Sequence, residues 1–301
     1  MRHFLKLSDL SKEEIFLLFD RVKQLKKFTR FCVNTESLKN HTLVMIFEKQ
    51  STRTRLSFEV GIQQLGGRAI YLNSRDTQLD RGEPIEDTAR VISRMCDLVM
   101  IRTYEQDTVN KFAENSKVPV INGLTNQFHP CQILADIFTF TEHRNSIENK
   151  IVVWIGDANN VCFSWIEAAK ILDFELRIST PPEFSINLPK SKNVTFFDDP
   201  QKACINADLI TTDVWTSMGF EDENQKRKKA FRNWKVDKEK ISLASSEVLF
   251  MHCLPAHRGE EVDAEVIDGE HSVVWEEAEN RLHTQKALME FLIGIKINEK
   301  K

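Results

Sequence analysis

The sequence lacks the features of several large classes of protein. Its six cysteines form no CxxC motif and show no paired spacing, so neither a zinc site nor a disulfide framework is indicated. No stretch is long and apolar enough to span a membrane, and the N-terminus, MRHFLKLSDLSKEE, lacks the apolar run of a signal peptide. We therefore expect reduced thiols, a cytoplasmic location and no membrane partner.

Positive charge is not in excess either. Lysine and arginine number 41 against 45 acidic residues, and the resulting net charge of −4 at pH 7 argues against a general nucleic-acid binder. An anionic ligand must therefore be held by arginines placed locally. The length of 301 residues suits two domains, and 41% hydrophobic with 29% charged residues is typical of a soluble globular protein.

Glycine-rich nucleotide motifs are absent as well. A glycine-containing turn at 156–160 follows an apolar run, as a dinucleotide-binding turn does, but it lacks the three-glycine spacing of a nicotinamide site. Its asparagines suit either a polar small molecule or simple turn chemistry. The chain also has no P-loop, no HExxH motif and no serine–histidine–aspartate order.

What is present is a repeated alternation of apolar, β-branched runs with amphipathic segments. This pattern predicts an α/β fold of two domains, each a parallel sheet flanked by helices. The polar segment 144–150 predicts a boundary between a first domain at 1–143 and a second at 150–282. The predicted strands are 42–47, 68–73, 97–102, 118–122, 151–155, 175–179, 194–197, 209–212, 248–252 and 273–275, and the predicted helices include 11–28, 86–95, 106–115, 130–143 and 276–293.

The segment Ser51-Thr52-Arg53-Thr54-Arg55 lies at a predicted strand-to-helix turn. A helix start offers free backbone N–H groups and the positive end of the helix dipole. Three hydroxyls and two guanidinium groups at such a turn predict an anion site, with phosphate as the favoured anion. The alternative is that Ser51 or Thr52 only caps the helix and that both arginines are solvated.

A second arginine-bearing position is the end of the predicted strand at 97–102. Active sites of parallel sheets collect at the carboxyl ends of strands, and Arg102 lies at such an end. Together with Arg53, Arg55 and His129 it is a candidate to surround one anion. The alternatives are a surface salt bridge for Arg102 and a histidine bonded to loop backbone for His129.

Polar groups of the second half suit an amino acid. Asp213 follows a predicted strand and suits an ammonium group, whereas Ser217 and nearby backbone amides suit a carboxylate. Cys253 follows another predicted strand, and for it an inert buried thiol is favoured over a nucleophile or a polar wall. The basic cluster at 226–229 is interpreted as a solvated helix face.

Several ordered blocks of the chain resemble one family. The sequence is similar to the ornithine carbamoyltransferases, within the aspartate/ornithine carbamoyltransferase family, along nearly its full length. The Ser-Met-Gly and His-Cys-Leu-Pro segments distinguish it from the aspartate-specific relatives, and the Ser-Met-Gly segment distinguishes it from the putrescine-specific ones. The matching blocks are FEKQSTRTRLSFE, DTARVISR, MIRTYEQ, HPCQILAD, GDANNV, TDVWTSMG, HCLPAHRGEEV and the Glu279-Asn280-Arg281 stretch.

The resemblance implies an enzyme that transfers the carbamoyl group of carbamoyl phosphate to the δ-amine of L-ornithine, giving L-citrulline and phosphate. It implies no metal and no cofactor, and a place in arginine metabolism, with biosynthesis as the expected direction. The first domain would bind carbamoyl phosphate and the second ornithine, and the final helix, with about 283–301, would return to the first domain. The alternatives are a carbamoyltransferase with another amine acceptor and a non-catalytic small-molecule sensor.

The resemblance also implies roles for individual residues. The carbamoyl phosphate site would contain Ser51, Thr52, Arg53, Thr54, Gln78, Arg102, His129, Gln132, Cys253, Leu254 and Arg281, and the ornithine site Asn160, Asp213, Ser217 and Met218. The catalytic set would be Arg102, His129, Asp213 and Cys253. Whether Asp213 or Cys253 promotes deprotonation of the amine is left open. Gln78 would reach the site of a neighbouring subunit, which implies a homotrimer with shared active sites.

Overall fold

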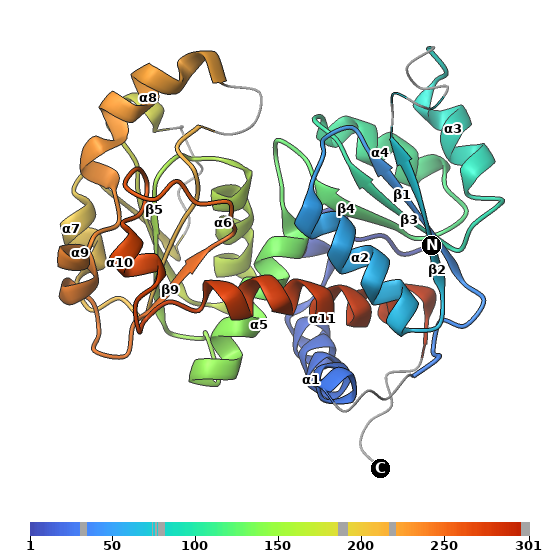
Figure 1. Cartoon of the computed structure of the whole chain (residues 1–301), viewed down its shortest axis with the longest axis horizontal. Helices are drawn as coiled ribbons and strands as arrows, with labels where there is room; N and C mark the ends of the chain where they lie inside the picture. Colours follow the sequence, from blue (N-terminus) through green and yellow to red (C-terminus); the bar gives the residue numbers. More distant parts are fainter. Residues whose placement is uncertain are drawn as a thin grey trace. The chain divides into compact units, whose positions relative to one another are not determined.

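The computed structural model describes residues 1–30, 35–73, 75, 77, 82–185, 192–216 and 221–295 (Figure 1). The chain forms two compact units, which we call unit 1 (residues 1–135 and 279–301) and unit 2 (residues 136–278). The chain enters unit 2 inside helix α5 (Pro130–Arg144) and leaves it inside helix α11 (Val274–Ile293). Each unit has its own parallel sheet, as the alternation of elements predicts.

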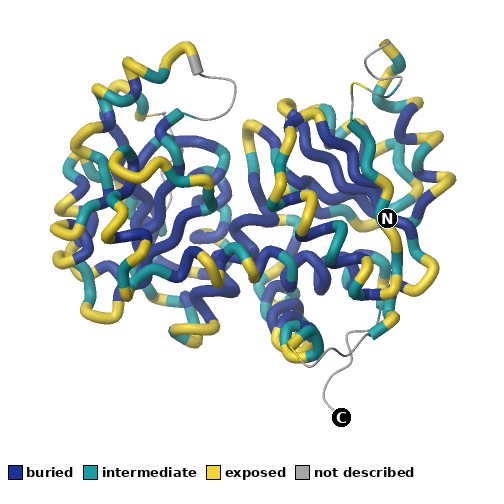
Figure 2. The backbone as a smooth tube through the Cα atoms, in the orientation of Figure 1, coloured by how far each residue is buried: buried dark blue, intermediate teal, exposed yellow. Residues whose placement is uncertain are grey.

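Unit 1 contains a four-stranded parallel sheet in the order β2-β1-β3-β4. Its strands are β1 (Thr42–Phe47), β2 (Arg68–Asn73), β3 (Leu98–Arg102) and β4 (Val120–Leu124). Every residue of β1 is buried, so its sequence is a continuous apolar run and not an alternation. Figure 2 shows β1, β3 and β4 as the buried centre of unit 1, while the edge strand β2 is more exposed.

Helices cover this sheet and bury its apolar faces. The helices are α1 (Lys12–Arg30), α2 (Thr52–Gln64), α3 (Ile85–Ile92) and α4 (Gln106–Asn115), with a short 3-10 turn at η1 (Leu7–Asp9). Helix α1 confirms the helix predicted at 11–28, and its apolar face is buried through Ile15, Leu18, Phe19, Val22 and Leu25. One face of β1 and β3 packs against α3 and α4 through residues such as Val44, Val99 and Phe112.

Unit 2 contains a five-stranded parallel sheet in the order β7-β6-β5-β8-β9. Its strands are β5 (Ile151–Ile155), β6 (Glu175–Ser179), β7 (Val194–Phe197), β8 (Leu209–Thr212) and β9 (Leu249–His252). Its helices are α6 (Asn160–Leu172), α7 (Pro200–Cys204), α8 (Asn224–Phe231), α9 (Lys238–Leu243) and α10 (Ala264–Ile267), with 3-10 turns η4 (Pro182–Phe184), η5 (Glu221–Glu223) and η6 (Arg232–Trp234). Val153, Ile210 and Phe250 of neighbouring strands share one buried cluster. The central strands β5 and β8 thus anchor the loops that follow them.

The last part of α11 belongs to unit 1, as the family resemblance implies. Glu290 is fully buried and accepts hydrogen bonds from Arg21 of α1, at 2.6 Å from Nε and 2.8 Å from Nη2. Lys26 of α1 donates to Asn280 at 2.9 Å. These buried polar contacts, with their fixed geometry, determine where α11 packs on α1.

Lys286 of α11 gives unit 1 a stability that depends on pH. Its Nζ donates to Thr29 and Gln64 at 2.6 and 2.8 Å, and burial lowers its pKa from 10.5 to about 8. Between these two values the unfolded chain binds more protons than the folded one, so this residue makes stability rise with pH. We expect wild type to gain about 3 kcal/mol relative to Lys286→Met across this window, measured by urea unfolding. Equal pH slopes for the two proteins would contradict this account.

The predicted strand at 273–275 is wrong, because α11 begins at Val274 and only an isolated bridge joins Ser272 to Phe250. Glu276 and Glu277 in the first turn of α11 favour the helix there, since carboxylates stabilise the positive end of its dipole. Among the helices of the described residues, none has the length and apolarity that crossing a membrane requires.

Candidate functional site

The turn after β1 lies beside the end of β3. Phe47 is in register with Arg102, so the carboxyl ends of the two strands lie together. Ser51 follows as the N-cap of α2, and its side chain accepts a hydrogen bond from the backbone N–H of Thr54 at 3.2 Å. Ser51 therefore caps α2, and this cap leaves the remaining N–H groups of the first turn available to an anion. The cap also places the first turn of α2 at the edge where Arg102 lies.

The first turn of α2 carries positive charge. It contains Arg53 and no acidic residue, unlike the first turns of α1, α3 and α11, which contain carboxylates. A cation at this end of a helix is repelled by the positive end of the helix dipole. A bound anion would be attracted both by this cation and by the helix dipole, and it would accept hydrogen bonds from the free backbone N–H groups.

Two arginines converge on one hydroxyl of this turn. Thr54 Oγ1 accepts a hydrogen bond from Arg102 Nη1 at 3.3 Å and from Arg281 Nη2 at 3.4 Å. Arg281 Nη1 also donates to Gln132 Oε1 at 2.6 Å. Thr54, Gln132 and the two arginines are each at most 4% exposed. Because burying like charges together is costly, this cluster favours an anion, and the Thr54 hydroxyl proton is available to donate to it.

His129 joins the same cluster from the start of α5. It is 5% exposed, and its backbone carbonyl accepts from the backbone N–H of Gln132 at 3.1 Å. Burial, together with the nearby cations Arg281 and Arg102, lowers the pKa of His129 well below its usual value. The imidazole is therefore neutral near pH 7 and is suited to donate a hydrogen bond without adding another charge.

Some predicted members do not join this cluster. Arg55 instead pairs with Glu59 at 3.1 Å and lies over the ring of Tyr71 at 4.1 Å. Thr52 is exposed. Gln78, Ser217 and Met218 lie outside the described residues. One buried cation was missed: Lys49, 6% exposed, follows the end of β1 and donates to Asn126 at 2.7 Å. Its position two residues after the end of a buried strand is the sequence feature that could have indicated this lysine.

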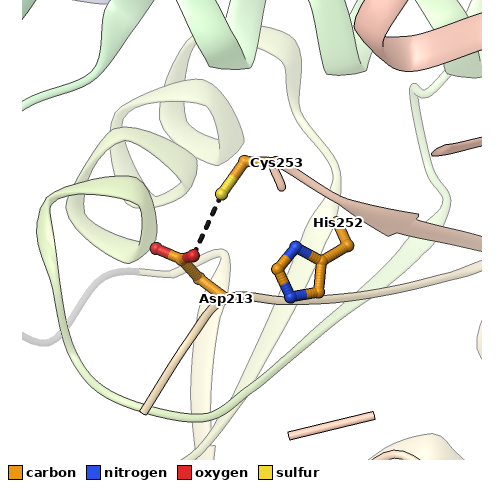
Figure 3. Close-up of side chains that lie close together, drawn as sticks. All are labelled: Asp213, His252 and Cys253. Carbon is orange, nitrogen blue, oxygen red and sulfur yellow. Dashed lines mark hydrogen bonds between the residues drawn. The ribbon is translucent and has the colours of Figure 1, made fainter. Parts of the chain in front are cut away.

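In unit 2, polar groups converge on Asp213 after β8. Its carboxylate accepts hydrogen bonds from Asn159 Nδ2 at 2.7 Å, from the backbone N–H of Val214 at 2.8 Å and from Cys253 Sγ at 3.1 Å. Figure 3 shows the Cys253 thiol pointing at this carboxylate. Asp213 is 9% exposed, so it is a mostly buried anion held in one orientation and suited to bind an ammonium group.

The two asparagines before α6 have different positions. Asn159 caps α6, accepting from the backbone N–H groups of Val161 and Cys162 at 3.0 and 3.2 Å, and its amide also holds Asp213. Asn160 is the first residue of α6 and is partly buried. Turn chemistry, one of the two interpretations offered for the asparagines of this turn, therefore describes Asn159. Gly156 begins this turn with φ +140°, and a Cβ there would lie 3.3 Å from Thr212 Oγ1.

Cys253 is held as a neutral thiol. Burial and the charge and hydrogen bond of Asp213 raise its pKa well above the usual value. A thiol that donates to a carboxylate is a poor nucleophile and cannot act as a base. The thiol therefore lies against the Asp213 carboxylate as a hydrogen-bond donor.

His252 supports the segment that carries Cys253. Its Nδ1 accepts from the backbone N–H of Leu254 at 2.9 Å, so the proton lies on Nε2, which is 3.2 Å from Glu261 Oε1. Both His252 and Glu261 are buried, and the peptide bond between Leu254 and Pro255 is cis. The side chains of Asp213, His252 and Cys253 bring candidate ligand atoms within 4.8 Å of one another, but both His252 nitrogens already make hydrogen bonds and the Cys253 thiol already donates to Asp213.

A buried ion pair fixes the segment that follows Asp213. Burial raises the pKa of Asp157, and Arg227 opposes that rise with an ion pair at 2.8 Å. Arg227 also donates to the backbone carbonyl of Trp215 at 3.1 Å and to Glu223 at 3.0 Å. The interpretation of 226–229 as a solvated face is therefore wrong for Arg227, because Asp157 draws it inward.

Removing this pair should destabilise unit 2. We expect Arg227→Ala to lower the free energy of unfolding by about 3 kcal/mol, since it leaves the Asp157 carboxylate buried without its cation. The measurement is urea unfolding followed by tryptophan fluorescence, because Trp215 lies in this segment. The exposed Lys229 provides the matched control, and Lys229→Ala should change stability by less than about 0.5 kcal/mol. Equal effects of the two changes would show that the ion pair does not stabilise the unit.

Comparison with known proteins assigns both parts of the chain to one family. Residues 2–142 match the family model described as "Aspartate/ornithine carbamoyltransferase, carbamoyl-P binding domain", and residues 148–292 match "Aspartate/ornithine carbamoyltransferase, Asp/Orn binding domain". The ornithine carbamoyltransferase of Azoarcus sp. is 61% identical over 297 residues, covering 97% of this chain and 96% of its own length.

Solved structures agree over the same length. The ornithine carbamoyltransferase from Burkholderia thailandensis is 56% identical, covers 98% of this chain and 99% of its own, and superimposes with a TM-score of 0.91. The anabolic ornithine carbamoyltransferase from Campylobacter jejuni is 42% identical, covers 97% and 99%, and gives a TM-score of 0.89. The chain therefore belongs to the aspartate/ornithine carbamoyltransferase family.

Proposed function

We propose that the protein transfers the carbamoyl group of carbamoyl phosphate to the δ-amine of L-ornithine, producing L-citrulline and phosphate. The observation that carries this proposal is the buried cationic cluster in which Arg102 and Arg281 share the Thr54 hydroxyl. This cluster lies in the part of the chain that matches a carbamoyl phosphate-binding domain and, through Arg281, in the returning helix α11. The relatives that cover nearly all of the chain are named ornithine carbamoyltransferases.

Carbamoyl phosphate is assigned to the cluster of unit 1. Its phosphate accepts hydrogen bonds from the first turn of α2, with Ser51, Thr52, Arg53 and Thr54 around it. Its carbonyl oxygen accepts hydrogen bonds that become stronger as negative charge develops on that oxygen. Arg102 and neutral His129 provide that stabilisation, and Gln132, held by Arg281, orients the carbamoyl amide.

Ornithine is assigned to the carboxylate of unit 2. Asp213 binds the α-ammonium group, because a mostly buried carboxylate held by Asn159 and Val214 strongly prefers a cation. Asn160 is a further polar contact for the amino acid. Ser217 and Met218, which lie outside the described residues, are assigned to ornithine by the family resemblance alone. Gln78, Cys253 and Leu254 are assigned to the carbamoyl group on the same basis.

The reaction requires a neutral δ-amine. An alkyl amine is mostly protonated near pH 7, so it must lose a proton before it attacks the carbamoyl carbon. Cys253 is itself a protonated donor to Asp213 and does not accept that proton. We assign to Cys253 and Asp213 an electrostatic and positioning role, with proton loss to solvent or to the leaving phosphate. Positioning and charge stabilisation then account for most of the rate.

Three broader features belong to the same proposal. The direction is arginine biosynthesis, which the anabolic relative from Campylobacter jejuni supports. The location is the cytoplasm. The assembly is a homotrimer with shared active sites, and exposed apolar side chains of unit 1, among them Leu56, Ile70 and Met95, are consistent with an interface there. Sedimentation of the purified protein at three times the mass of 34.9 kDa would support the trimer, and a monomer would refute it.

The decisive experiment offers three amines to the enzyme with carbamoyl phosphate. Ornithine, putrescine and aspartate are each supplied in turn, and the carbamoylated product is identified by mass. Citrulline from ornithine alone is the expected result. Product from another amine would retain the phosphate site and overturn the assignment of Asp213. No product from any amine would favour a small-molecule sensor.

A further inference from the structure

The turn that follows the His252–Cys253 segment carries a second group of possible ligands. It is tightly held, because the backbone N–H of Gly259 donates to the carbonyl of Val262 at 2.8 Å and that of Glu260 to His257 at 2.9 Å. Val262 is fully buried and also pairs with Val236. A turn fixed in this way holds its side chains at defined positions, which a binding site requires.

Three side chains of this turn face one another. His257, Glu260 and Glu261 each offer one ligand atom, and these atoms lie within 4.8 Å of one another. The His257 Nδ1 to Glu261 Oε2 distance is 3.9 Å. Two ligands on one tetrahedral zinc ion lie about 3.3 Å apart, so only small side-chain adjustments would close the site. His257 is 56% exposed at its side chain and Glu260 33%, which leaves both free to make them.

An independent observation comes from the buried member of the group. The Glu261 side chain is fully buried, and its Oε1 accepts from the backbone N–H of His257 at 2.5 Å and lies 3.2 Å from His252 Nε2. Its Oε2 is also buried and has no hydrogen-bond partner within the described parts of the chain. A buried carboxylate oxygen without a partner costs about 1–3 kcal/mol or more. A cation beside Oε2 would remove that cost.

The local charge also favours a cation. Lys228 Nζ pairs with Glu260 Oε1 at 2.6 Å, so the single positive charge of Lys228 faces the two negative charges of Glu260 and Glu261. One imidazole nitrogen with two carboxylate oxygens is a donor set for zinc-like transition metals, whereas magnesium and calcium prefer oxygen alone. His252, bonded to the other oxygen of Glu261, would orient that ligand.

We propose that His257, Glu260 and Glu261 form a binding site for one divalent transition-metal ion such as Zn²⁺, with solvent completing its coordination. The bound ion ties the exposed turn to the buried Glu261, and through it to His252 and the segment that carries Cys253. It stabilises the folded chain by mass action. This site is independent of the proposed carbamoyl transfer, since none of its ligands is assigned to either substrate.

The test must separate this site from the neighbouring group of Asp213, His252 and Cys253. We would therefore titrate Zn²⁺ by calorimetry and Co²⁺ by absorption spectroscopy into the full chain carrying Cys253→Ser. A cobalt ion bound by a thiolate shows a sulfur-to-metal charge-transfer band, whereas one bound by histidine and carboxylates does not. We expect stoichiometric binding that survives Cys253→Ser and lacks this band.

Ligand variants complete the test. In the same background, His257→Ala should weaken Zn²⁺ binding by at least about 10- to 100-fold, the loss seen even when an outer partner of a ligand is removed. Glu260→Gln should act in the same direction. His143→Ala and Glu265→Gln, at exposed positions of unit 2, should leave the affinity unchanged. Circular dichroism verifies that each variant is folded.

Two outcomes would overturn the proposal. One is equal Zn²⁺ affinity for the background protein, His257→Ala and Glu260→Gln, all folded. The other is loss of all binding on Cys253→Ser alone, which would place the ion at the thiol. Because the readout is metal affinity, failure here would leave the proposed carbamoyl transfer untouched, and absence of citrulline formation would leave the metal site untouched.

Discussion

Arg102→Ala should reduce kcat/KM for citrulline formation by about 10³-fold or more, while the protein stays folded. In other enzymes, the loss of a single preorganised hydrogen-bond donor to a developing oxyanion lowers kcat by about 10²- to 10³-fold. The Arg102→Ala substitution removes a positive charge in addition to the donor. The fold should survive, because Arg102 shares Thr54 with a second buried cation, Arg281, so its removal relieves repulsion. Steady-state kinetics and urea unfolding measure the two effects.

The control for this prediction is another arginine of unit 1. Arg94 lies on the surface, and Arg94→Ala should change kcat/KM by less than about twofold, as is usual for an exposed position away from special contacts. Arg102→Lys should recover little activity, since an ammonium cannot reproduce the planar fork of a guanidinium. Unchanged turnover in folded Arg102→Ala would refute the assignment of carbamoyl phosphate to this cluster.

Asp213→Asn should lower kcat/KM for ornithine by about 10²-fold, which corresponds to the loss of a charge-assisted hydrogen bond to the α-ammonium group. The KM for carbamoyl phosphate should change little, because that substrate is assigned to unit 1. Asp222 is exposed and close in sequence, so Asp222→Asn serves as the control and should behave as wild type. A larger effect on carbamoyl phosphate than on ornithine would contradict the assignment.

The same variant should make the Cys253 thiol more acidic. Burial is the main cause of its raised pKa, and the Asp213 charge and hydrogen bond raise it further. Neutralising Asp213 removes the second cause, so the pH profile of alkylation by iodoacetamide should move to lower pH. The reaction is followed at Cys253 by peptide mass, because Cys131, with a pKa raised to about 12, and the other buried cysteines react slowly. An unchanged profile would show that Asp213 does not control this thiol.

Local hydrophobic patterns predicted most of the architecture. The strand at 42–47 and the helix that begins after Ser51 are observed as β1 and α2. Both elements have strong local signals, a continuous apolar run in the first case and a cap with helical periodicity in the second. The false strand at 273–275 shows the limit of such signals. An apolar run this short has no periodicity that distinguishes a strand from a helix, and its residues from Val274 onward belong to α11.

Side-chain direction within the site was less predictable. Arg53 and Arg55 are separated by one residue in the sequence, and the Arg55 side chain contacts Glu59 and Tyr71. Arg227 is drawn inward by Asp157, which lies seventy residues earlier. Partners so distant in sequence are brought together by the order of the strands, and no local pattern encodes them.

The sequence by itself determined the fold class, the family and the location of the strand-to-helix turn at which we propose an anion to bind, because these depend on hydrophobic periodicity, on helix caps and on ordered motifs that are local in the chain. The tertiary structure alone decided which groups act together. It brought Arg281 to Thr54 beside Arg102, set Cys253 as a donor to Asp213 and left one oxygen of Glu261 buried beside His257. These arrangements depend on long-range packing and on the desolvation of charges, which act only once the chain has folded.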